Sequence, residues 1–217
     1  MNKKAHIKQI LKKLTPLYPN PTTELTHKTP FQLLIATILS AQCTDTRVNK
    51  VTKTLFQKYK TPIDFANADQ KQLEHDIHST GFYRNKSKHI IASSKIITGK
   101  YNSTVPRTMQ QLTTLPGVAR KTANVVLSEA YSINEGIAVD THVARLSKRL
   151  GLSQEKYPKK IEKDLMRITP KSKWRTLSNF LIFHGRKTCH ARNPKCARCA
   201  LEKICHVPPI QKNPPKM

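Results

Sequence analysis

Four cysteines near the C-terminal end of the sequence are the residues best suited to chemistry by their type and spacing. Cys189, Cys196, Cys199 and Cys205 form the pattern C-x6-C-x2-C-x5-C within CHARNPKCARCALEKIC, and the chain has five cysteines in all. This segment has few apolar residues with which to fold by itself, so four thiolates around one metal centre would supply the energy that orders it. We therefore predict that these four cysteines are metal ligands.

The spacing leaves the kind of metal centre open. Structural zinc sites usually have paired short spacings, whereas the ligands of iron–sulfur clusters often wrap a larger object from one loop. Two disulfides or unligated thiols are the alternatives, and the reducing compartment expected of a chain without an export signal argues against disulfides. The neighbouring His190 and His206 could substitute as ligands, although such residues are more often solvated. Cys43 is interpreted as a small buried apolar residue.

A lysine at the start of a helix is the second candidate. The segment LPGVARKTANVV places a Pro-Gly break before Arg120 and Lys121, and an apolar helical run follows. With the preceding residues it predicts a helix, a tight turn and a second helix, whose unpaired N–H groups can bind a phosphate. The partly positive helix start disfavours an ammonium ion, which favours a nucleophilic neutral amine at Lys121. A plain helix connection with a solvated lysine is the alternative.

Asp140 is a candidate catalytic carboxylate in a chain with only 13 acidic residues. It lies among apolar residues in GIAVDTHVARL, where its simplest role is to cap the following helix. A capping carboxylate can also face a cleft and stabilise positive charge during a reaction. His142 could be a second polar group there, although a packed or solvated histidine is commoner.

The composition predicts a nucleic-acid partner. Thirty-nine Lys and Arg against 13 Asp and Glu give 217 residues a formal charge of +26, spread along the whole chain. A phosphate backbone is the commonest partner of such a surface, with an anionic membrane surface or an unusually basic proteome as alternatives. The longest apolar run, residues 31–39, is too short to span a membrane. The N-terminal segment lacks the apolar centre of a signal peptide, so we expect a cytoplasmic protein that associates with the nucleoid through DNA.

Helical periodicity recurs throughout the sequence and alternating strand patterns are nearly absent, so we predict an all-α fold of about ten helices. The spacing of Ile7, Ile10 and Leu14 predicts an amphipathic N-terminal helix that docks on the protein. The segment PFQLLIATILSAQ is apolar nearly all round and should form a central buried helix. The tail at 207–217 is rich in proline and is expected to be disordered.

Glycines mark the expected ends of elements. Gly81, Gly99 and Gly151 each follow a helical pattern and should end a helix. Gly117, Gly136 and Gly185 fall in predicted turns.

Together these motifs resemble the endonuclease III family, the bifunctional DNA glycosylase/AP lyases of the helix-hairpin-helix superfamily. ILSAQCTD, LPGVARKTANVVL, VDTHVAR and the four-cysteine loop occur in the family's order, and the resemblance covers nearly the whole chain except its tail. It implies two helical domains flanking a DNA-binding cleft. A six-helix barrel with the helix-hairpin-helix would span residues 23–131, and residues 1–22 and 132–217 would form an iron–sulfur domain. It also implies a [4Fe-4S] cluster on the four cysteines.

The resemblance assigns roles to individual residues. Lys121 matches the family's nucleophile and Asp140 its catalytic carboxylate. Gln42 matches the residue that enters the duplex where the damaged base leaves, and Phe82 stands where the family commonly has a leucine wedge. Ala119 replaces the usual second hairpin glycine, at a cost on the order of 1 kcal/mol if the position needs a positive φ. The predicted DNA-binding set is Gln42, Phe82, Leu115, Gly117, Val118, Ala119, Arg120, Lys195 and Arg198.

The implied activity is the removal of oxidised pyrimidines from double-stranded DNA, followed by strand cleavage at the abasic site through a lysine Schiff base. The expected partner is DNA with damaged pyrimidines or abasic sites; no membrane is involved and the protein is a monomer. Alternatives are a non-catalytic iron–sulfur protein that binds DNA or senses redox state, an adenine-mismatch glycosylase, and a structural zinc module. The first needs neither Lys121 nor Asp140, and the second has no lysine at this position.

Overall fold

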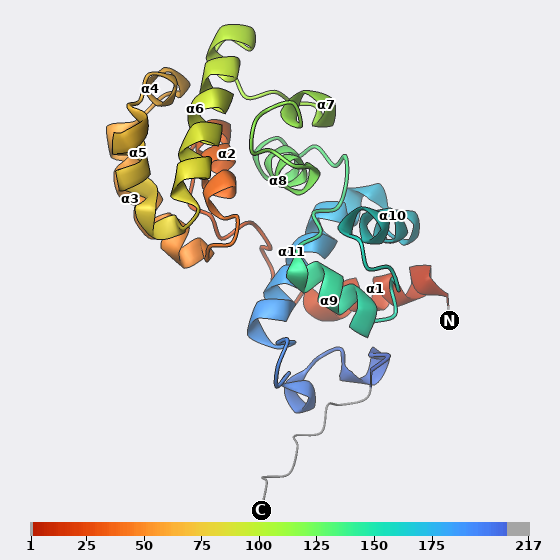
Figure 1. The fold of residues 1–217 in the computed structure, drawn as a ribbon. Coiled ribbons are helices and arrows are strands. Elements are labelled where there is room, and N and C mark those ends of the chain that lie inside the picture. Colours follow the sequence, from red (N-terminus) through yellow and green to blue (C-terminus); the bar gives the residue numbers. More distant parts are fainter. Residues whose placement is uncertain (1, 208–217) are drawn as a thin grey trace, which may run out of the picture. The chain divides into compact units, whose positions relative to one another are not determined.

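A computed structural model describes residues 2–207 (Figure 1). Eleven α-helices and four short 3-10 helices make up the regular secondary structure of these residues, and no strand occurs among them. The predicted all-α fold is therefore confirmed. Most of the predicted disordered tail, from position 208 onward, lies outside the described residues. No helix between residues 2 and 207 combines the length and apolar content that a bilayer crossing requires.

The chain divides into two compact units. We call Thr23–Glu135 the hairpin unit, and Met1–Thr22 together with Gly136–Met217 the cysteine unit. Each unit has its own apolar core, so each can position functional side chains by itself.

Helix α2 (Pro30–Leu39) is the central helix of the hairpin unit. Every residue from 31 to 39 except Gln32 is buried, and α3, α6 and α8 pack against this helix. The nearly uniform apolar sequence predicted this position, because a helix without a polar face must be covered on all sides. The other elements of the unit are α3 (Asp45–Lys58), α4 (Pro62–Ala66), α5 (Gln70–Ile77), η1 (His78–Thr80), α6 (Tyr83–Lys100), α7 (Met109–Leu112) and α8 (Arg120–Ala130).

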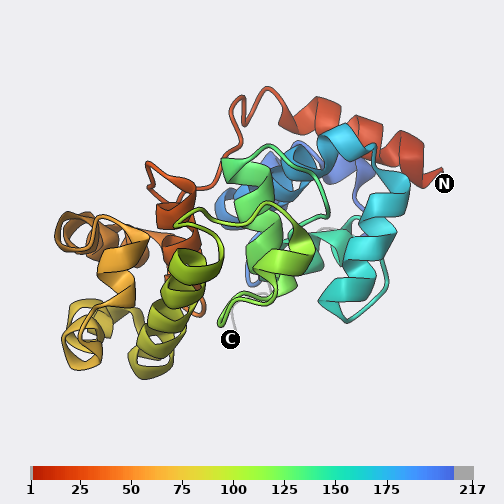
Figure 2. The same cartoon turned by 90° about the horizontal axis from the view of Figure 1, so that it is seen from above.

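The cysteine unit joins the N-terminal helix to the C-terminal half of the chain. Helix α1 (Lys3–Leu14) buries Ile7, Ile10 and Leu14, and it packs on α10 and α11, as its amphipathic pattern predicted (Figure 2). Helix α1 therefore shares one core with two helices that are far from it in the sequence. The other elements are α9 (Thr141–Arg149), α10 (Pro158–Ile168), η2 (Lys171–Lys173), α11 (Trp174–Lys187), η3 (Cys196–Arg198) and η4 (Glu202–Ile204).

Short polar side chains set the start of several helices. Thr29, Thr44 and Thr61 accept backbone N–H bonds at the start of α2, α3 and α4, and Asp69 and Asp140 do so for α5 and α9. Each cap satisfies a backbone N–H that has no partner within its helix. Helix α8 differs, because it begins after an alanine that offers no side-chain cap.

The predictions for two glycines are wrong. Gly99 lies inside α6 instead of ending it, and Gly185 lies inside α11 instead of in a turn. A Cβ on Gly185 would stand 2.9 Å from the Cβ of His142 and 3.1 Å from Nη2 of Arg145. This glycine therefore permits α9 and α11 to approach closely, a requirement that a single sequence does not distinguish from a turn.

Candidate catalytic, DNA-binding and cysteine sites

The hairpin between α7 and α8 is anchored by apolar side chains. Leu115 and Val118 are buried, and the N–H of Val118 donates to the carbonyl of Leu115 at 3.1 Å. The Ser93 hydroxyl donates to the carbonyl of Pro116 at 2.7 Å, which fixes the turn to α6. Gly117 is exposed at the tip with φ +77°, in the left-handed region that favours glycine. The turn is thus held firmly while its tip faces outward.

The backbone at Ala119 carries no strain. Its φ of −82° and ψ of 169° are extended backbone, so the cost expected for a positive φ does not arise. Ala119 is exposed and supplies no side-chain acceptor for the first turn of α8. The N–H groups at a helix start without such a cap can bind an anion, because they also lie at the positive end of the helix dipole.

Lys121 lies in the first turn of α8 and is exposed. The next two residues, Thr122 and Ala123, are buried in the core of the hairpin unit, and Arg120 is half-buried. Burial of one face of α8 fixes the helix, so the amine of Lys121 extends from a rigid base beside the hairpin turn.

We expect Gly117→Ala to destabilise the protein by about 1–2 kcal/mol, because a Cβ at positive φ is strained. The added Cβ would also stand 2.9 Å from the Cβ of His89. Gly99→Ala is the matched control: it meets open space inside a helix and should stabilise by about 0.5–1 kcal/mol. Urea unfolding of both variants measures the difference, and equal stabilities would contradict the described hairpin geometry.

Gln42 and Phe82 share an unusual backbone conformation. Their φ angles are +53° and +48°, in the left-handed region that residues other than glycine seldom adopt. Both are exposed in the hairpin unit, and Phe82 leaves 61% of its surface open to solvent. Gln42 follows α2 and Phe82 directly precedes α6. Such residues persist when their surroundings fix them, and they are concentrated at functional sites.

Asp140 caps α9 in the cysteine unit, as its sequence context predicted. Its Oδ1 accepts the backbone N–H of Val143 at 2.8 Å, and the residue is half-buried. His142 is packed beside Nη2 of Arg145 at 3.1 Å, and burial lowers its pKa while the carboxylate of Asp140 acts in the opposite direction. Asp140 and Lys121 belong to different units, and each is held by its own unit's core.

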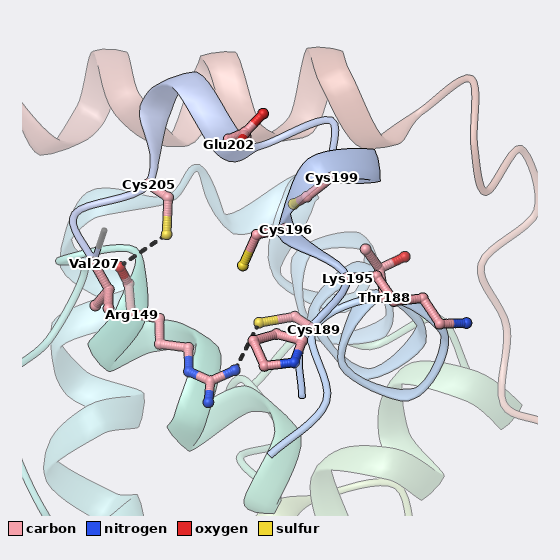
Figure 3. A pocket seen from close by; sticks show the side chains of 10 residues that line it. Arg149, Thr188, Cys189, Lys195, Cys196, Cys199, Glu202, Cys205 and Val207 are labelled. Atoms are coloured by element: carbon pink, nitrogen blue, oxygen red, sulfur yellow. Dashed lines mark hydrogen bonds between the residues drawn. The ribbon is translucent and has the colours of Figure 1, made fainter. Parts of the chain in front are cut away.

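The four clustered cysteines line one cavity of about 40 Å³ in the cysteine unit, and this cavity is partly open to solvent (Figure 3). Figure 3 shows the sulfur atoms of Cys189, Cys196 and Cys205 turned toward this space, with Cys199 beside them. None of the five cysteines, all of which lie among the described residues, is joined in a disulfide.

Four cysteines around one cavity are a donor set that an iron–sulfur cluster can use. Between residues 2 and 207, no group of three His, Cys, Asp or Glu side chains converges closely enough to hold one metal ion. Burial raises the pKa of the Cys199 thiol, and the other three cysteine thiols raise it further. If all four cysteines are deprotonated, their thiolates would need a cationic centre between them, and an iron–sulfur cluster is one such centre.

Two arginines of α9 hold the cysteine loop, and the sequence prediction missed both. Nη1 of Arg149 donates to Cys189 Sγ at 3.1 Å and to the carbonyl of His190 at 2.7 Å. Nη2 of Arg145 donates to the carbonyls of Cys189 and Gly185, at 2.9 and 3.0 Å. Their spacing of four residues places them on one helix face, and that spacing is the signal that could have identified them.

His184 supports the cysteine site from α11. Its Nε2 lies 3.2 Å from Cys199 Sγ, and its Nδ1 lies 3.3 Å from the hydroxyl of Tyr18. Burial lowers the pKa of His184 to about 4, so the ring is neutral near pH 7. On the same loop, Lys195 directly precedes η3 and Arg198 is its last residue, and both are exposed.

Comparisons with known proteins give one consistent result. Residues 35–171 match the HhH-GPD superfamily of base excision DNA repair proteins. The chain is 51% identical over 204 residues to endonuclease III of Synechocystis sp. (strain ATCC 27184 / PCC 6803 / Kazusa). The matched region covers 94% of this chain and 93% of that protein. It is 50% identical to endonuclease III of Bacillus subtilis (strain 168), over 92% and 93% of the two chains. A solved trapped endonuclease III–DNA covalent intermediate matches with a TM-score of 0.90 and 47% identity, over 95% of this chain and 97% of that one.

Proposed function

The chain belongs to the endonuclease III family, within the HhH-GPD superfamily of base excision DNA repair proteins, and we propose that Lys121 is its nucleophile. It is a DNA glycosylase. The observation that carries the proposal is the exposed amine of Lys121 in the first turn of α8, directly after a hairpin turn whose tip is open to solvent.

Borohydride trapping tests this proposal directly. Duplex DNA that contains an oxidised thymine is incubated with the protein and sodium borohydride, which reduces an imine to a stable amine. A protein–DNA adduct is expected, because a lysine nucleophile passes through a Schiff base. Base release without any adduct would favour a glycosylase that uses water, as the adenine-mismatch alternative predicts.

The hairpin is proposed to bind the DNA backbone. The N–H groups at the start of α8, which no side chain caps, can donate to a phosphate, and this contact carries no base information. The formal charge of +26 adds a general attraction to the duplex. Similar proteins solved as endonuclease III–DNA complexes support DNA as the partner.

Gln42 and Phe82 are proposed to enter the duplex. A damaged base inside the stack cannot be reached, so it must leave before its glycosidic bond is broken. An exposed apolar ring such as Phe82 can unstack neighbouring bases, and the Gln42 amide can hydrogen-bond to a base that has lost its partner. We propose oxidised pyrimidines as the bases that are removed.

The proposed reaction begins at C1′ of the extruded nucleotide. A bond forms from the neutral Lys121 amine to C1′ while the bond to the base breaks, and the base leaves with the electron pair and takes up a proton. The sugar ring then opens, which leaves an imine between Lys121 and C1′. Loss of the C2′ proton expels the 3′ phosphate and cleaves the strand, and water finally hydrolyses the imine and restores the amine.

Asp140 is proposed to stabilise the sugar as it becomes positively charged. One carboxylate oxygen accepts the Val143 N–H, and a carboxylate has further lone pairs for a second partner. Because the cap fixes the side chain, its negative charge is held in place before the reaction begins.

Cys189, Cys196, Cys199 and Cys205 are proposed to hold a [4Fe-4S] cluster. When bound, the cluster supplies iron–thiolate bonds that order the loop. Arg149 donates to Cys189 Sγ and thereby connects the site to α9, the helix that Asp140 caps. The ordered loop presents Lys195 and Arg198 on its exposed side.

We expect Lys195→Ala and Arg198→Ala each to lower the salt dependence of DNA binding. A side chain that contacts one phosphate releases about one counterion, so the slope of log K against log salt should fall by roughly one unit. Lys159→Ala, on an exposed position of α10 in the same unit, is the matched control. Fluorescence anisotropy at several salt concentrations gives the slopes. Unchanged slopes for both loop variants would remove this loop from the DNA interface.

A further inference from the structure

Lys86 is a buried lysine that the proposed reaction does not use. It lies on α6 in the hairpin unit, and only 4% of its surface is exposed. Its Nζ donates to the carbonyls of Leu39 and Thr80, both at 2.8 Å. Burial lowers its pKa, and the nearby Cys43 thiol acts in the opposite direction. A buried ammonium ion is costly unless hydrogen bonds compensate it, so its retention needs a reason.

The two carbonyls lie at the bases of two different loops. Leu39 is the last residue of α2, and Gln42 follows three positions later. Thr80 is the last residue of η1, and Phe82 follows two positions later. The carbonyls at the ends of these helices carry partial negative charge, which favours an ammonium group between them. One nitrogen atom therefore connects the two loops that carry Gln42 and Phe82.

A second contact ties Lys86 to one of these loops. Its backbone N–H donates to the carbonyl of Phe82 at 3.0 Å, in the first turn of α6. Lys86 thus fixes the Phe82 loop from both its main chain and its side chain, and it reaches the Gln42 loop through its side chain. The left-handed conformations of Gln42 and Phe82 are strained, and they persist only where the surroundings determine them.

We propose that Lys86 is the positioning residue that sets the spacing between Gln42 and Phe82, so that both enter the duplex together. This inference rests on the proposed function of those two residues. The two loop bases cannot separate without breaking a hydrogen bond to the same ammonium group. The cation acts on the step that extrudes the base and takes no part in the chemistry at C1′.

The test compares Lys86→Met with Lys88→Met, a change at an exposed position two residues along the same helix. Two substrates separate positioning from chemistry. A duplex with an oxidised thymine requires extrusion, whereas an abasic site in single-stranded DNA presents its aldehyde without it. For Lys86→Met, we expect single-turnover base release from the duplex to fall about tenfold or more, while borohydride trapping on the single strand changes less than about twofold.

Fluorescence of a 2-aminopurine placed beside the lesion reports unstacking independently of catalysis. Lys86→Met should delay or reduce this signal, and Lys88→Met should match the wild type. A folded Lys86→Met protein with normal unstacking and normal duplex rates overturns the inference. Equal losses on both substrates also overturn it, because they indicate a general effect on the fold. A wild type that forms no adduct on either substrate overturns the proposed function as well.

Lys86→Arg is a second test variant, which keeps the inference testable if Lys86→Met does not fold. It keeps a buried cation, but its planar guanidinium is larger than an ammonium group and moves the two carbonyls apart. We expect a folded protein with the same loss confined to the duplex substrate. Wild-type rates on both substrates would show that the ammonium group does not set the loop spacing.

Discussion

Lys121→Gln is expected to abolish strand cleavage and the borohydride adduct while leaving DNA affinity nearly unchanged. Removal of a nucleophile that forms a covalent intermediate costs on the order of 10⁴-fold in rate, because the amide of glutamine cannot form the imine. Gel assays of cleavage and adduct formation on an abasic duplex measure the loss. Lys121 is exposed, so we expect the free energy of unfolding to change by no more than about 0.5 kcal/mol.

Lys50→Gln is the matched control for this prediction. Lys50 is also an exposed lysine on a helix of the hairpin unit, α3, and its removal changes the net charge equally. It should retain full cleavage. A Lys121→Gln protein that forms the adduct at the normal rate would show that another amine attacks C1′.

Asp140→Asn should slow base release on the order of 10²- to 10⁴-fold, the usual range for a charged group that assists at the reacting centre. Asparagine caps a helix about as well as aspartate, so the bond to the Val143 N–H can be kept while the charge is lost. The stability of this variant should therefore stay within about 1 kcal/mol of the wild type. Single-turnover glycosylase rates and urea unfolding measure the two effects.

Asp69→Asn provides the control for Asp140→Asn, because Asp69 caps α5 in the hairpin unit with the same kind of contact, to the Gln72 N–H at 2.8 Å. It should leave the rate of base release unchanged. If both variants release the base at the wild-type rate, Asp140 has only its capping role.

The helices that position the site could be predicted from the sequence because their patterns are local. The apolar run of α2 specifies a buried helix, and the spacing of Ile7, Ile10 and Leu14 specifies the docking face of α1. Asp140 was predicted as a cap because an acidic residue before an apolar periodic segment is a local helix signal. The four cysteines identify their own site by spacing, since few other roles require them so close together.

The contacts between distant elements could not be predicted in this way. Lys86 looks like any basic residue of an amphipathic helix, and only the fold shows that its ammonium reaches the ends of α2 and η1. Gly185 looks like a turn residue until α9 is seen packed against it. Ala119 suggested a strained hairpin, yet the backbone places an ordinary extended residue there. In each case the deciding partner is remote in the sequence.

The central claim is that one amine, that of Lys121, forms the covalent intermediate, and mapping the adduct tests it most directly. The borohydride-reduced complex of the wild-type protein with duplex DNA is digested with nuclease and protease, and mass spectrometry locates the residual sugar. The chain has 28 lysines that could in principle form an imine, so the position of the adduct is informative. We expect the sugar on Lys121 and on no other residue. A sugar on another lysine or on the N-terminal amine, with Lys121 unmodified, would contradict the claim.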